Sequence, residues 1–179
     1  MANKTQVATV GEQQAAIVIN NQFIDGLTKQ LEEKCKYGLS FPKDYNLSNA
    51  LMGAYLVLKE TKDKNNKPIL ESCSQISIAN SLMNMATLGL SVQKKQGYFV
   101  SYAGQCQFQR SYFGNITIAR RYGMKDIHAE IICQGDKFKY HIEDGNKVLD
   151  SHEQDFMNID NEKILGAYAV GLMEDGTKH

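Results

Sequence analysis

The chain has 179 residues, of which 42% are apolar, and its formal net charge is zero. This length and composition suit one globular domain with a single core. No apolar run approaches the ~20 residues that span a bilayer, and the polar segment 1–14 lacks the apolar core and cleavage site of a secretory signal peptide. We therefore expect a cytoplasmic protein with no membrane partner, in which residues 1–15 are disordered and residues 16–179 form one domain.

The first half of the chain has the apolar spacing of amphipathic helices. Apolar residues recur about every four positions in residues 17–36 and again in 47–62, which predicts a helix over each range. A third helix is predicted from Ser74, a good N-cap, to Leu88, with Gly89 as the left-handed residue that ends it.

The hydrophobic period changes after residue 96, where short aromatic-rich segments replace the helical spacing. Residues 97–103 and 105–111 are predicted to form a β-hairpin that turns at Ala103-Gly104. A helix over 112–122, closed by Gly123, is expected to follow it.

Strands are predicted in the last third of the chain. Residues 125–134 alternate in polarity as a strand does, and residues 137–142 are expected to be its hairpin partner. Residues 164–173 form a further predicted strand, for which the sequence shows no partner, so the chain looks as though it ends before the fold does. Helices come first and strands follow, which predicts the α+β class.

The zero net charge hides an uneven distribution along the chain. Residues 1–71 have a balance of +1 and residues 126–179 a balance of −7, whereas residues 72–125 have a balance of +6 and no acidic residue. We call residues 72–125 the basic block; it contains all three arginines of the chain. The acidic last third is either a solvated surface or a face that meets the basic block of a neighbouring subunit.

Aromatic residues crowd into the basic block as well. Basic residues with interleaved aromatics are typical of proteins that bind single strands, because cations hold phosphates and rings stack on bases. Phe99 and Phe108 are expected to point inward instead. Charge alone leaves a nucleic acid and some other anionic partner as equal alternatives. The seven aromatic residues are Tyr98, Phe99, Tyr102, Phe108, Tyr112, Phe113 and Tyr122.

The motifs of common catalytic and metal sites are absent. The sequence has no GxxxxGK[ST] phosphate loop, which excludes the ATP-driven strand-exchange recombinases, and no HExxH. His141-Ile-Glu143 resembles the H-x-E of zinc deaminases, but no P-C-x-x-C follows. Four widely separated cysteines without a CxxC pair are interpreted as reduced, mostly buried thiols. Acidic pairs could hold Mg²⁺ in a nuclease but are more often solvated: Glu143-Asp144, Asp150/Glu153 and Asp155/Asp160.

Three stretches of the basic block, in this order and with short gaps, resemble the RecT family of phage single-strand annealing proteins. Ala86-Thr-Leu-Gly-Leu-Ser91 matches the family's A..LGL segment, and the predicted hairpin supplies Gly97-Tyr-Phe-Val-Ser-Tyr102 and Gln105-Cys-Gln-Phe-Gln109. The third stretch, from Tyr112-Phe-Gly114 to Ile118-Ala-Arg-Arg-Tyr-Gly123, is similar to the family's Y.G.i.lA.r.G.

The chain also departs from the family pattern. Family members often have an acidic residue and Pro where this chain has Ser91-Val92, a Pro where it has Ser101, and a Lys where it has Phe113. RecT proteins also continue past the last predicted strand. The resemblance therefore implies a domain that is short at its C-terminus.

The resemblance implies an α+β core related to that of Rad52-type annealing proteins, and homo-oligomers that form rings or filaments. It also implies ATP-independent binding of single-stranded DNA and annealing of complementary strands in phage-type homologous recombination. The implied partners are single-stranded DNA, the annealed duplex intermediate, a phage exonuclease and a host single-strand binding protein. No cofactor is expected, with Mg²⁺ as a candidate modulator of DNA binding or assembly.

The candidate DNA-binding residues fall into three chemical groups. Gln107 and Gln109, alternate residues of one strand, should share a face and donate hydrogen bonds to backbone or base edges. Tyr112 should present a ring that orders or stacks on the strand. No catalytic or metal-binding residue is expected, and the rival hypotheses are a basic-faced protein-interaction module and a Mg²⁺-dependent nuclease. The cations expected to neutralise phosphates are Lys94, Lys95, Arg110, Arg120, Arg121 and Lys125.

Overall fold

The computed structural model describes residues 19–179. The expectation of disorder in residues 1–15 lies outside them. Backbone contacts group the chain into two compact units, of which the first ends at Asn115 and the second comprises Ile116–His179. Helices precede antiparallel strands, so the predicted α+β class is confirmed. That residues 16–179 act as one domain stays a prediction.

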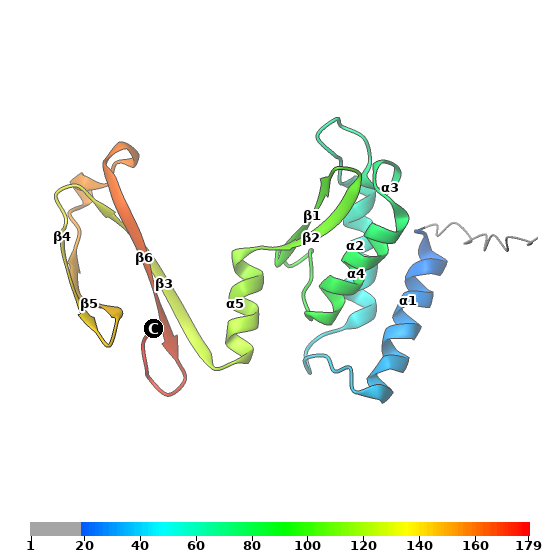
Figure 1. The fold of residues 1–179 in the computed structure, drawn as a ribbon, viewed down its shortest axis with the longest axis horizontal. Coiled ribbons are helices and arrows are strands. Elements are labelled where there is room, and N and C mark those ends of the chain that lie inside the picture. The colour runs from blue at the N-terminus through cyan, green and yellow to red at the C-terminus, as the bar shows by residue number, and fades with distance from the viewer. Residues whose placement is uncertain (1–18) are drawn as a thin grey trace, which may run out of the picture. The chain divides into compact units, whose positions relative to one another are not determined.

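Four helices build the core of the first unit (Figure 1). α1 covers Asn21–Lys34, α2 Leu47–Glu60, α3 Ile69–Ser72 and α4 Gln75–Thr87, and a 3-10 turn at 35–37 follows α1. α2 contacts each of the other three helices. Burial of branched apolar side chains is the main stabilising term in such a core. The largest fully buried side chains from these helices are Ile24, Leu31, Leu51, Leu58, Ile69, Ile78, Leu82 and Met85.

The three long helices begin at polar caps. The side-chain oxygens of Asn20, Asn46 and Ser74 each accept the backbone N–H three residues on, at 2.9, 2.8 and 3.3 Å. Gly89 follows α4 with φ +61°, so the predicted start and stop of the third helix are confirmed. α1 begins at Asn21, later than its apolar spacing predicted, because Asn20 is its N-cap.

The predicted hairpin is confirmed, together with its turn. β1 covers Gly97–Tyr102 and β2 covers Gln105–Arg110, paired in antiparallel register. The turn residues Ala103 and Gly104 both have positive φ, +48° and +74°, as a two-residue hairpin turn of the favoured hand requires. Alternation along each strand gives the hairpin an inward face against α4 and an outward face toward solvent.

The inward face of the hairpin is fastened to α4. Phe99 and Phe108 are both buried there, as expected, with ring centroids 5.8 Å apart. The backbone N–H of Cys106 donates to Ser77 Oγ at 2.8 Å, and Ser81 Oγ donates to the carbonyl of Cys106 at 2.9 Å. Two hydroxyls of α4 thus satisfy the backbone groups of Cys106 and hold the hairpin on this helix.

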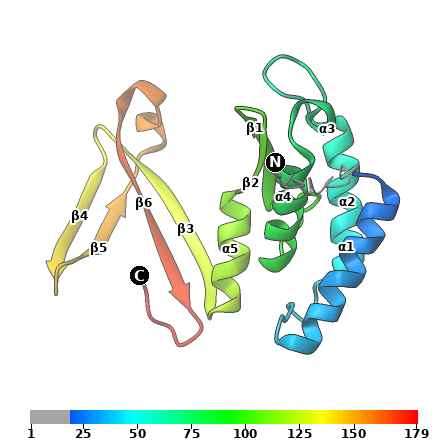
Figure 2. The ribbon, with the colours of Figure 1, turned by 45° about the vertical axis from the view of Figure 1, so that its right-hand side comes forward.

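The second unit is made mainly of two two-stranded ladders. β3, Met124–Cys133, pairs with β6, Ile164–Met173, and β4, Lys137–Glu143, pairs with β5, Asn146–Glu153. β3 and β6 run side by side in both ribbon views (Figures 1 and 2). The boundary between the units falls within α5, Tyr112–Arg121. Short 3-10 turns at 156–158 and 161–163 precede β6.

Two strand assignments from the sequence were wrong. The partner of residues 125–134 is β6 and not 137–142, which pair with β5 instead. The last strand therefore has a partner within the chain, with Ala129 opposite Ala169. The missed strand β5 follows Asp144-Gly145, both with positive φ, which is a strong two-residue hairpin turn.

A buried carboxylate joins the two ladders of the second unit. Asp136 is fully shielded and accepts from the backbone N–H of Cys133 at 2.7 Å and from Gln154 Nε2 at 3.0 Å. His152 Nε2 lies 3.2 Å from the same carboxylate, and its other ring nitrogen lies 3.0 Å from the hydroxyl of Tyr168 on β6. The hydrogen bond from Gln154, followed by those from Cys133, His152 and other donors, lowers the pKa of Asp136 to about 2.

Candidate nucleic-acid interface

The loop between α4 and β1, residues 91–96, presents Lys94 and Lys95 to solvent. The start of α5 fixes this loop, because Ser111 Oγ donates to the carbonyl of Lys95 at 2.6 Å. The backbone N–H of Ser111 also donates to the carbonyl of Gln96 at 3.2 Å. The end of the loop that carries the two lysines is therefore held by Ser111.

Arg110 lies at the same end of the hairpin as this loop. It is exposed and pairs across the ladder with Gly97, the residue that directly follows the loop. We call Lys94, Lys95 and Arg110 the cationic end of the hairpin. Among residues 19–179, no ion pair engages these three side chains. Three like charges that share one end of a hairpin without a carboxylate partner favour binding of a polyanion.

The first turn of α5 adds an exposed ring beside the cationic end. Ser111 caps the helix by accepting the backbone N–H of Gly114 at 3.2 Å. Gly114 is required there, because a Cβ atom would collide with the carbonyl oxygen of Gln96. Tyr112 is 65% exposed, and its ring centroid lies 3.9 Å from that of Phe113. The sequence hypothesis of an accessible ring at Tyr112 fits this geometry.

Gln107 and Gln109 lie on the outward face of the hairpin, both exposed. Their cross-strand partners are Val100 and Tyr98. The structure thus places six of the nine candidate residues on the hairpin, the loop before it and the helix start after it. These six belong to the first unit.

The other three candidate cations belong to the second unit. Arg120 and Arg121 end α5, and Lys125 lies near the start of β3. The guanidinium of Arg120 lies 3.9 Å from the carboxylate of Asp126. A phosphate that binds Arg120 would therefore compete with this carboxylate. Asp126 is the first acidic residue after the basic block.

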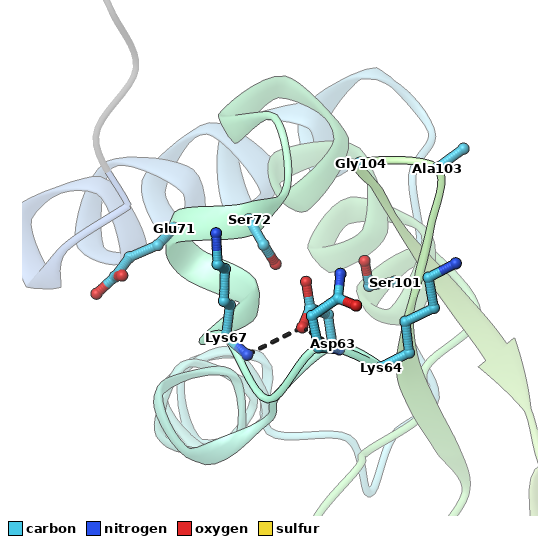
Figure 3. A pocket seen from close by; sticks show the side chains of 9 residues that line it. Asp63, Lys64, Lys67, Glu71, Ser72, Ser101, Ala103 and Gly104 are labelled. Atoms are coloured by element: carbon cyan, nitrogen blue, oxygen red, sulfur yellow. Dashed lines mark hydrogen bonds between the residues drawn. The ribbon is translucent and has the colours of Figure 1, made fainter.

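A hollow of about 540 Å³ lies beside the hairpin turn (Figure 3). Lys64 and Lys67 line it, but so do Asp63 and Glu71, so its formal charges cancel. The carboxylate of Asp63 accepts the backbone N–H groups of Asn65 and Lys67 at 2.8 and 2.9 Å, and this bonding, with that from Lys67 as the largest cause, lowers its pKa. The hollow is polar and lacks the excess positive charge of the cationic end.

The candidate DNA-binding residues predicted from the sequence omit three residues of the outward hairpin face, although two of them are among the aromatic residues of the basic block. Tyr98 and Tyr102 are 54% and 72% exposed, and Gln105 is exposed opposite Tyr102. The signal for them was present, because strand residues alternate between faces and Phe99 was already expected to point inward. Its even-numbered neighbours on β1 must then point outward.

Two features bear on the rival hypotheses. No three His, Cys, Asp or Glu side chains gather closely enough to hold a metal ion anywhere in residues 19–179. One acidic pair makes local contacts, since Asp150 lies 2.8 Å from His141 Nδ1 and Glu153 lies 2.9 Å from Lys137 Nζ. The four cysteines are free, and Cys35 alone among them is exposed. The helices of the described part of the chain are all too short or too polar to cross a membrane.

Comparison with known proteins places the chain in a family. It is 32% identical over 115 residues to a protein of Bacillus subtilis (strain 168) that is named Uncharacterized protein YqaK. The aligned region covers 63% of this chain and 39% of YqaK, so the match spans about two fifths of that relative. The family model described as RecT family matches residues 48–179, which include the hairpin, the cationic end and both ladders. The chain belongs to the RecT family.

Proposed function

We propose that this protein binds single-stranded DNA and anneals complementary strands without a nucleotide cofactor, as a step in phage-type homologous recombination. The observation that carries the proposal is the cationic end of the hairpin, three unpaired cations among the described residues beside exposed tyrosine rings. Membership of the RecT family supports the same function. The absence of a phosphate loop from the sequence supports independence from ATP.

The nine candidate residues have three roles in binding, which are hydrogen bonding, ordering of the strand by a ring, and neutralisation of phosphates. Gln107 and Gln109 donate hydrogen bonds from the outward hairpin face, and Tyr112 orders the strand at the helix start. The protein holds one strand with its bases open, a complement enters, and base pairing supplies both the sequence specificity and the driving force. The protein therefore acts as a binding protein and not as an enzyme. The phosphate ligands are Lys94, Lys95 and Arg110 in the first unit and Arg120, Arg121 and Lys125 in the second.

Assembly would extend this surface from one subunit to the next. Side-by-side copies in a ring or filament present repeated cationic ends to one long strand, which raises affinity through multivalency. The annealed duplex intermediate, a phage exonuclease and a host single-strand binding protein are the further partners that we propose.

The test is a charge-removal variant, Lys94→Gln/Lys95→Gln/Arg110→Gln, titrated against a labelled single strand at several salt concentrations. Each lost phosphate contact lowers the slope of log affinity against log salt by about 0.7, so the three should lower it by about 2. The matched control is Lys64→Gln/Lys67→Gln, which removes two lysines from the charge-balanced hollow.

The control should keep the wild-type salt slope. Equal slopes for the wild type and the triple variant, with both folded, would contradict the assignment of the cationic end. Absence of binding by the wild type at low salt would leave a basic-faced protein-interaction module as the better account.

A further inference from the structure

The outward face of the hairpin has an unusual composition for an exposed surface. β1 contributes Tyr98, Val100 and Tyr102, and β2 contributes a glutamine opposite each of them. All six side chains are exposed, yet none is charged. Exposed strand positions are ordinarily rich in charged residues, which protect a sheet from aggregation. Two rings with a valine between them, beside a column of three amides, therefore call for a ligand that suits both kinds of side chain.

A groove of about 500 Å³ runs beside this face, between α4 and β2. None of the residues that line it is charged. Asn80 and Asn84, one helical turn apart on α4, face the groove together with Gln105 and Gln107 of the hairpin. A side-chain amide carries both hydrogen-bond donors and an acceptor. Gln105 Oε1 already accepts from Ser74 Oγ at 3.1 Å, which leaves the Nε2 donors of Gln105 for a ligand. The outward hairpin face and the groove thus form one uncharged surface, which we call the amide–aromatic face.

The chemistry of this face matches nucleobases better than phosphates. Phosphates need cations, and these stand at one end of the same hairpin in Lys94, Lys95 and Arg110. Bases offer a flat ring for stacking and a polar edge for hydrogen bonds, which tyrosine rings and side-chain amides satisfy. A strand whose phosphates lie on the cationic end would therefore turn its bases toward the uncharged part.

We propose that the amide–aromatic face binds the unpaired bases of a single strand, with Tyr98 and Tyr102 stacking on bases and Gln105 contributing a base-edge contact. This proposal rests on the proposed function, single-strand binding. It adds that the cationic end holds the phosphates and the amide–aromatic face holds the bases. The two rings are four residues apart on one strand, or about 13 Å. Adjacent bases in a duplex strand are only about 3.4 Å apart, so the two rings contact separate bases and do not share one stack.

The test compares a labelled dT oligonucleotide with an abasic oligonucleotide of equal length and charge. The variant Tyr98→Thr/Tyr102→Thr removes both rings and keeps the β-propensity of the strand. Stacking is worth about 1–3 kcal/mol per base, so affinity for dT should fall at least tenfold. Affinity for the abasic strand and the salt slope should not change. The two single variants should add, because their sites are more than about 10 Å apart.

Two further variants sharpen the result. Tyr98→Phe/Tyr102→Phe keeps the rings and should keep the affinity for dT. Tyr37→Ala removes another ring of the first unit, which is 89% exposed outside the hairpin, and should have no effect. Thermal unfolding of each variant establishes that it is folded.

Two results would overturn the inference while leaving single-strand binding intact. One is equal affinity of the wild type for dT and for the abasic strand. The other is a ring-free variant, folded as the wild type is, that binds dT with wild-type affinity. Absence of wild-type binding to both oligonucleotides would instead overturn the proposed function and this inference with it.

Discussion

The two units of the molecule are stabilised in different ways. The first unit buries branched apolar side chains from four helices, whereas Cys133 is the one buried apolar side chain among the described residues of the second. The second unit exposes large apolar residues such as Phe156, Met157 and Leu165, and it relies on two strand ladders and the buried carboxylate of Asp136.

This difference shows where a precise binding surface can be built. The hairpin of the first unit is fastened to α4 through Ser77 and Ser81, so its outward side chains project from a rigid support. Binding residues are most effective when the elements that hold them do not move. Six of the nine proposed DNA-binding residues lie on this unit.

The largest expected effect comes from the core of the first unit. Leu82→Ala removes a fully buried side chain from α4, and we expect a loss of about 2–5 kcal/mol in the free energy of unfolding. Urea unfolding followed by circular dichroism measures it. Leu165→Ala, which changes an exposed leucine of β6, is the control for the second unit and should change stability much less. Similar losses for the two variants would contradict the comparison of the units.

A smaller loss of stability is expected at the contact between Gly114 and the loop of residues 91–96, which carries the two lysines. Gly114→Ala forces a Cβ atom against the carbonyl of Gln96, and relief of such a clash costs about 1–3 kcal/mol. The shifted loop should also weaken single-strand binding, because it carries Lys94 and Lys95. Gly26→Ala in α1, where a Cβ would meet nothing within 4 Å, should instead stabilise the protein by about 0.5–1 kcal/mol. Stability and affinity that are unchanged in Gly114→Ala would argue against the fixed loop.

The second unit should respond to acid through Asp136. Its pKa of about 2 in the folded state lies below the ordinary value of 3.8, so its ionised form stabilises the fold above about pH 4. That contribution falls as the pH drops from about 4 toward 2 and is absent below both values. The measurement is the urea midpoint of the second unit at several pH values, followed by NMR signals of β3 and β6.

Asp136→Asn should remove this part of the pH dependence. Asp150→Asn, which changes a half-exposed carboxylate beside His141, is the matched control. An unaltered acid profile in Asp136→Asn would show that ionisation of this carboxylate does not stabilise the second unit.

Local signals in the sequence predicted local structure well. Ser74 and Gly89 marked the ends of α4, and Ala103-Gly104 marked the hairpin turn, because caps and tight turns depend on residues only a few positions apart. The turn at Asp144-Gly145 was equally readable, and β5 could have been predicted from it. Alternation from Phe99 would have identified Tyr98 and Tyr102 as outward residues.

Long-range pairing could not be read in the same way. The partner of β3 is β6, and the segment between them contains a complete hairpin and two 3-10 turns. Strand pairing over such a distance depends on packing that no local pattern encodes. The hydrogen bonds to the carboxylate of Asp136 could not be predicted for the same reason, because Gln154, His152 and Asn158 lie 16 to 22 positions away in the sequence. The sequence also could not show that the candidate cations divide between two units, because the units are defined by backbone contacts and not by spacing along the basic block.

The most direct test of the central claim is an annealing assay with this chain. A labelled single strand is first bound at low salt without ATP, its complement is added, and duplex formation is followed by fluorescence energy transfer between the two strands. We predict salt-sensitive binding and duplex formation faster than that of the free strands, with both reduced in Lys94→Gln/Lys95→Gln/Arg110→Gln. Duplex formation at the rate of the free strands by a folded, DNA-bound protein would contradict annealing, and absence of binding would contradict the claim altogether.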